Sequence, residues 1–125
     1  MHKTPKNTQQ EDSSWKGVPL DKEAEWHKVF QSSREILKLS APCPLCGQSS
    51  LHRWYLSSMP LEREIEGIRF TARGGLWEWC KSCRSFMHYQ ALVPEWWVCD
   101  LEVDEAILSP YPTAIEAAIE RKGKQ

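Results

Sequence analysis

Two CxxC pairs hold four of the five cysteines in this 125-residue chain. Cys43 and Cys46 form the first pair, and Cys80 and Cys83 form the second. Two thiolates separated by two residues can bind one metal ion from the tip of a tight turn, and two such turns supply the four sulfurs of a tetrahedral site. These four cysteines are therefore predicted to bind one structural zinc ion.

The fifth cysteine and the N-terminus bear on where such a protein works. Cys99 alternates with apolar residues in a strand-like run, which places it in the core and outside the metal site. An odd cysteine count argues against a fully oxidised framework, and paired cysteines in a reducing compartment favour metal binding. The first residues contain no hydrophobic signal segment. We expect a soluble, cytoplasmic protein.

Periodicity predicts two helices in one domain. Residues 1–14 are polar after Met1 and are expected to form a flexible tail, followed by a single domain over 15–125. Apolar residues recur at steps of three and four over 21–39, which predicts an amphipathic helix that ends before Pro42. Thr113 and Glu116 have the spacing of a capping box and predict a short helix over 114–122.

Alternating apolar residues predict short strands between and after the cysteine pairs. The expected strands cover 51–56, 68–72, 76–79, 87–93 and 97–103. Gly74 and Gly75 lie between two of these runs and predict a hairpin turn there. The fold class is α+β: a small antiparallel sheet with an N-terminal amphipathic helix and a short C-terminal helix.

Residues 41–93 resemble the zinc ribbon superfamily. The resemblance lies in the turn from Cys43 to Gly47, the turn from Cys80 to Cys83, and the strands that enter and leave them. It implies that the four cysteines are the zinc ligands. Arg84 replaces the glycine expected after the second pair, which predicts a strained or differently shaped turn. A weaker similarity connects residues 113–119 to the C-terminal helix of bacterial and phage zinc ribbons of the Lar restriction-alleviation type.

The same four-thiolate set is also typical of rubredoxin, so a rubredoxin-like electron carrier that binds iron is an alternative. Catalysis is not expected. Four protein ligands leave no open coordination position for a substrate or water, and the chain contains no Gly-rich phosphate loop, HExxH motif or nucleophile elbow.

The distribution of charge suggests a binding function. The formal net charge is only -1, but residues 91–120 contain seven acidic side chains and no Lys or Arg. We hypothesise that an acidic, tryptophan-bearing strand over 95–105 binds a basic surface of a partner protein, because complementary charge steers association. An immunity or antitoxin-type inhibitor of a bacterial toxin would fit this description. The expected partner contacts are Trp96, Asp100, Glu102 and Asp104.

The alternative binding function is that of a nucleic-acid-binding, transcription-associated zinc ribbon. Residues 41–90 contain six basic and four acidic side chains. Basic residues would contact phosphates, and neighbouring tryptophans would stack on bases. The candidate contacts are Arg53, Arg69, Arg73, Lys81 and Arg84, with Trp54, Trp77 and Trp79 as stacking partners.

Overall fold

A computed structural model describes residues 14–123, and the predicted tail over 1–14 lies almost wholly outside them. The fold is α+β, as predicted. Its centre is a five-stranded sheet in the order β1-β5-β4-β3-β2. The strands are β1 (Lys16–Gly17), β2 (Leu37–Lys38), β3 (Leu51–Ile65), β4 (Ile68–Cys80) and β5 (Ser85–Pro94). The sheet is mixed and not wholly antiparallel, since β1 runs parallel to β5.

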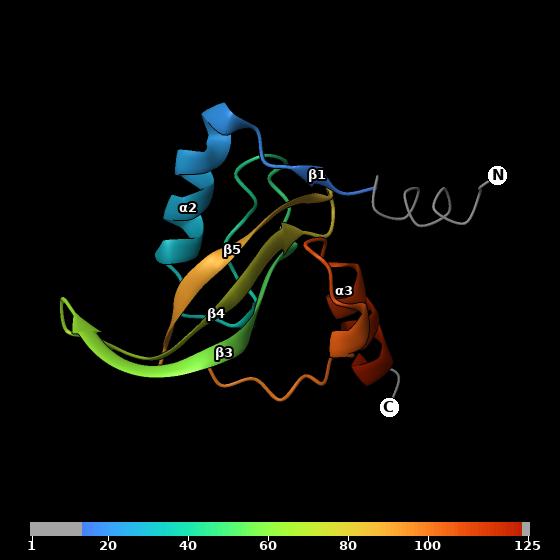
Figure 1. Cartoon of the computed structure of the whole chain (residues 1–125). Helices are drawn as coiled ribbons and strands as arrows, with labels where there is room; N and C mark the ends of the chain where they lie inside the picture. Colours follow the sequence, from blue (N-terminus) through green and yellow to red (C-terminus); the bar gives the residue numbers. More distant parts are fainter. Residues whose placement is uncertain (1–13, 124–125) are drawn as a thin grey trace.

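Strands β3 and β4 form one long hairpin whose tip projects from the body of the molecule (Figure 1). The turn is at Glu66 and Gly67, which both have positive φ angles, 52° and 82°. Two such residues make the tight turn that matches the twist of a hairpin. The hairpin turn predicted at Gly74 and Gly75 is therefore wrong.

Gly74 and Gly75 lie inside β4, where they serve close packing. A Cβ atom added to Gly74 would come within 1.9 Å of the carbonyl oxygen of Leu56 on β3. The glycine allows the two backbones to approach beside an irregularity in the β3–β4 pairing near Ser57.

One helix covers each face of the sheet, giving three layers (Figure 1). Neighbouring residues of β4 point to opposite faces and contact different helices. Glu78 accepts a hydrogen bond from Trp26 of α2 (Glu23–Gln31), whereas Trp79 donates one to Glu116 of α3 (Thr113–Gly123). The core consequently divides between the two faces, with tryptophans on both.

The N-terminal helix is much shorter than the predicted 21–39. A 3-10 turn, η1 (Leu20–Lys22), precedes α2, which ends at Gln31. Ser32 and Ser33 follow, and serine side chains compete for backbone hydrogen bonds at helix ends. The guanidinium of Arg53 then donates hydrogen bonds to the carbonyl oxygens of Phe30, Ser33 and Glu35. These hydrogen bonds prevent the chain from continuing as a helix. The C-terminal helix agrees closely with the predicted 114–122.

Residues 95–105 form an irregular segment, here called the strap, instead of the predicted strand. A turn with a hydrogen bond from the Trp97 amide to the Pro94 carbonyl begins it, and the 3-10 turn η2 (Glu105–Ile107) follows it. Trp97 and Leu101 are buried and anchor the strap to the body. Within the described residues, no helix is long and apolar enough to span a membrane.

Candidate metal centre

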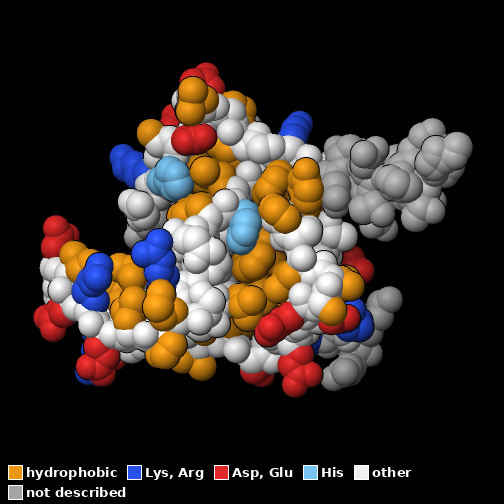
Figure 2. Space-filling model, in the orientation of Figure 1, with side chains coloured by type: hydrophobic (Ala, Val, Ile, Leu, Met, Phe, Trp, Pro, Cys, Tyr) orange, Lys and Arg blue, Asp and Glu red, His pale blue; other side chains and the backbone are white. Residues whose placement is uncertain are grey.

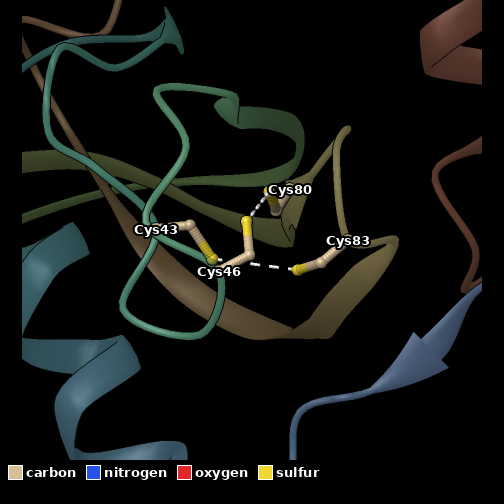
Figure 3. Close-up of side chains that lie close together, drawn as sticks. All are labelled: Cys43, Cys46, Cys80 and Cys83. Atoms are coloured by element: carbon tan, nitrogen blue, oxygen red, sulfur yellow. Dashed lines mark hydrogen bonds between the residues drawn. The ribbon is translucent and has the colours of Figure 1, made fainter.

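The four sulfurs of Cys43, Cys46, Cys80 and Cys83 converge between two loops (Figure 3). All four lie within 4.8 Å of one another. The Sγ atoms of Cys43 and Cys83 are 3.8 Å apart, and those of Cys46 and Cys80 are 3.7 Å apart. Tetrahedral ligands about 2.3 Å from a central ion are separated by about 3.8 Å, which is the geometry of a zinc tetrathiolate. The predicted ligand set thus fits a metal ion.

Strand pairing brings the two cysteine turns together. The first turn leads into β3 and the second follows β4, and the register places Leu51 opposite Cys80. Two further contacts fasten the loops, a hydrogen bond from the Lys81 amide to the Ser50 carbonyl and one between the hydroxyls of Ser50 and Ser82. The hairpin therefore fixes the position of all four thiols.

The two cysteine turns have the same backbone form. Gly47 and Arg84, each following the second cysteine of its pair, have φ angles of 81° and 64°. The Gly47 amide donates to the Cys43 carbonyl and the Arg84 amide donates to the Cys80 carbonyl. One predicted alternative, a differently shaped turn at Arg84, is therefore wrong. The second turn holds a non-glycine residue in a left-handed conformation, at a cost of about 1 kcal/mol or more.

The protein environment acts differently on the thiols of the cluster. Burial raises the pKa of Cys43 and of Cys80. For Cys83, burial raises the pKa, but hydrogen bonds with Ser85 and the neighbouring thiols outweigh that effect and lower it. A thiol must lose its proton to bind a metal, and a divalent cation supplies the charge that stabilises the thiolates in a buried position. The amide of Leu45 also donates to the Cys43 sulfur, as such amides do around metal-bound thiolates.

Cys99 and two histidines lie outside the four-sulfur cluster. Cys99 is half-buried and packs against the α3-side core, which includes Trp54 and Trp77. His52 and His88 each donate a hydrogen bond from Nδ1, to the carbonyls of Leu37 and Leu76 respectively. As expected, Cys99 is not part of the cluster, and it packs against the core while remaining half-buried.

The structure separates the four predicted partner contacts into two groups. Asp100, Glu102 and Asp104 are exposed on the strap. Asp100 forms an ion pair with Lys122 of α3, which lowers its pKa through a hydrogen bond. Trp96 is partly buried, with the guanidinium of Arg34 4.4 Å from its ring centre. The turn at residues 94–97 explains why both Trp96 and Trp97 find cover within the chain.

The candidate nucleic-acid contacts are spread over different environments. Arg53 is buried, and Arg69 pairs with Glu62 and Glu95 at the hairpin. Arg84 lies over the ring of Trp15. Arg73 and Lys81 are exposed, but the three stacking candidates, Trp54, Trp77 and Trp79, are all buried.

A polar cluster that the sequence pattern did not predict lies beneath α2. Glu78 is 2% exposed and accepts hydrogen bonds from the indole of Trp26 and the hydroxyl of Tyr89. Burial raises the pKa of Glu78 to about 7. Arg53 lies opposite Glu78 in the β3–β4 register and is 3% exposed. The sequence feature that could have indicated this cluster is a single acidic residue, Glu78, between two tryptophans in a run predicted to be a strand.

Comparisons with protein-family models, with curated proteins and with solved structures give no match for this chain.

Proposed function

We propose that this protein is a non-enzymatic interaction module stabilised by one zinc ion, and that its strap binds a basic surface of a partner protein. Zinc is preferred because four convergent thiolates at tetrahedral spacing are its usual structural ligands. The ion would be fully coordinated by protein, so its role is to hold the two loops together.

The exposed acidic side chains of the strap are the main support for this proposal. Trp97 and Leu101 anchor the strap in the core, while Asp100, Glu102 and Asp104 point to solvent. Asp100 has 88% of its side chain exposed even though it pairs with Lys122. Acidic side chains gather at the lower right of the molecule, where the strap approaches α3 (Figures 1 and 2).

Exposed apolar side chains accompany these carboxylates. Val98 is 79% exposed within the strap, and Ile107 is 59% exposed just beyond it. Apolar side chains surrounded by charge are typical of protein interfaces, where burial supplies affinity and charge supplies orientation. A basic partner with an apolar patch fits this surface, and a toxin whose active site handles nucleic acid has that chemistry. The protein would then act as an immunity or antitoxin-type inhibitor.

The nucleic-acid alternative receives less support from the same surfaces. Its stacking residues are buried, Arg53 is engaged inside the protein, and the strap would repel a phosphate backbone within a Debye length of about 8 Å.

A charge-reversal comparison tests the proposal. Asp100, Glu102 and Asp104 are changed together to Lys, and a control variant carries the same three changes at Glu62, Glu64 and Glu66 of the hairpin. Both variants alter net charge equally. The wild type and the control should capture the same basic protein from the native source and inhibit its activity, whereas the strap variant should do neither.

Other outcomes reject the proposal. Equal capture by both variants would remove the strap from the interface. Tighter binding of DNA or RNA by the strap variant, without loss of a protein partner, would favour the nucleic-acid alternative. Iron in place of zinc in the purified protein would redirect the assignment to electron transfer.

A further inference from the structure

A cleft of roughly 560 Å³ lies on the α2 face of the sheet, where the helix ends early. Because α2 stops at Gln31, it covers only part of this face, and the hairpin extends past its end (Figure 1). The walls are mostly apolar and aromatic. They include Phe30, Phe70, Leu76, Ala91, Trp96 and Trp97.

Polar groups gather along the same cleft and are fixed in place by the fold. Arg53, Glu78 and Tyr89 all line it. The terminal nitrogens of Arg53 are bound to backbone carbonyls, and Glu78 is held between Trp26 and Tyr89. An apolar cavity with a few positioned polar groups is the usual form of a small-molecule site.

Two buried N–H groups of the cleft residues have no acceptor among the described residues. They are Nε of Arg53 and Nε1 of Trp96. A buried donor left without a partner costs about 1–3 kcal/mol, so a ligand that offers an acceptor would recover part of that energy. The exposed Arg34 lies over one face of the Trp96 ring, and its displacement would open that face to a ligand.

The charges around the cleft favour an uncharged ligand. A cation would meet the guanidinium groups of Arg53 and Arg34, which already lie over Trp97 and Trp96. An anion would meet the carboxyl of Glu78, which is 2% exposed and carries charge above its pKa of about 7, while the terminal nitrogens of Arg53 are already bound to backbone carbonyls. A planar neutral molecule avoids both penalties and matches the aromatic walls.

We propose that this cleft binds a small, uncharged, planar molecule whose ring packs between the aromatic walls and whose carbonyl accepts a hydrogen bond from Trp96 Nε1. The site is separate from the metal centre. Its walls include Trp96 and Trp97 of the strap but none of the acidic strap residues, so binding of a small molecule does not depend on the proposed interaction function. A heteroaromatic or aromatic amide has the required chemistry.

Indole N–H signals in NMR spectra of the isotopically labelled, zinc-loaded protein provide a direct test. Benzamide serves as the probe, with toluene, benzoate and benzamidine as matched compounds lacking the carbonyl acceptor or carrying a charge. Benzamide should shift the Trp96 Nε1–H signal in a saturable manner. The Trp77 signal is an internal control, since its indole donates to the Ser109 carbonyl on the opposite face.

Two variants separate specific binding from a general effect. Ala91→Leu should fill the cleft and weaken benzamide binding at least tenfold, while Gln90→Leu, on the opposite face of β5, should leave it unchanged. Trp96→Phe keeps an aromatic wall without the N–H and should also weaken binding.

The proposal is overturned if millimolar benzamide leaves the Trp96 signal unmoved, or if Ala91→Leu has no effect on the shift. Binding of toluene, benzoate or benzamidine as strong as that of benzamide would also overturn it, because the carbonyl and the absence of charge would then be irrelevant.

Discussion

Gly47 and Arg84 occupy equivalent positions in the two cysteine turns, with φ angles of 81° and 64° and an amide that donates to the first cysteine of each pair. One turn uses the residue that adopts this conformation freely, and the other uses arginine. The guanidinium of Arg84 lies 3.9 Å from the centre of the Trp15 ring and donates to the Ser14 hydroxyl. These contacts offset the conformational cost at Arg84.

Substitutions at Arg84 should therefore differ in effect. Arg84→Ala keeps the unfavourable φ and loses the contact with Trp15, so it should lower the free energy of unfolding by about 1 kcal/mol. Arg84→Gly loses the same contact but relieves the backbone, and should be close to neutral. Urea denaturation of the zinc-loaded proteins measures both. A larger loss for Arg84→Gly than for Arg84→Ala would contradict the explanation.

Gly74 should tolerate no side chain. Gly74→Ala would place Cβ 1.9 Å from the Leu56 carbonyl oxygen, a backbone atom that cannot move alone. We expect a loss of about 3 kcal/mol, the upper end of the usual range for overpacking. Gly75→Ala approaches only side chains, at 3.2 Å or more, and should cost less. Gly17→Ala meets nothing within 4 Å and is the control in the same denaturation series.

Glu78 should make stability depend on pH. Its pKa is raised from 4.5 to about 7, so the folded state holds a proton that the unfolded state releases at lower pH. The stabilisation from this proton is complete below pH 4.5, the pKa of the carboxyl in the unfolded chain, and is lost as the pH rises through the folded-state pKa of about 7. Between pH 6 and 8 the wild type should lose about 1 kcal/mol relative to Glu78→Gln.

Denaturation of both proteins across that range, with zinc bound, gives the difference. Using the difference cancels the titration of other groups common to both. A gap between the two proteins that stays constant from pH 6 to 8 would show that Glu78 does not titrate there.

The sequence predicted the four-cysteine cluster because the spacing of two CxxC pairs is typical of a metal site. It also predicted the α+β class and the short C-terminal helix from periodicity. It could not place the end of α2, since residues 32–36 continue the helical pattern while Arg53, distant in sequence, binds their carbonyls. Such tertiary competition is invisible to a local pattern.

The glycine pair and the strap show the same limit. Gly74 and Gly75 have the composition of a turn, but their role is close backbone approach, which depends on the opposing strand. The strap has the alternation of a strand, and the alternating residues Trp97 and Leu101 are indeed buried, yet the strap is not a strand of the sheet. Alternation therefore predicted which residues are covered better than it predicted their secondary structure.

Metal removal from the intact protein tests the dependence of the fold on the four cysteines. Structural zinc supplies folding free energy on the order of 10 kcal/mol in small units. A strong chelator should abolish the cooperative unfolding transition of this chain, and restoring zinc should recover it. A chelator-treated protein with an unchanged transition would show that the sheet is stable without the metal.

Cys43, Cys46, Cys80 and Cys83 are predicted to bind one structural zinc ion. The most direct measurement is the metal content per chain of the wild type, of Cys46→Ser and of Cys99→Ser, by native mass spectrometry. We predict one zinc ion in the wild type and in Cys99→Ser, and loss of stable zinc binding in Cys46→Ser. A folded wild-type chain with no metal, or equal zinc content in all three proteins, would contradict this prediction.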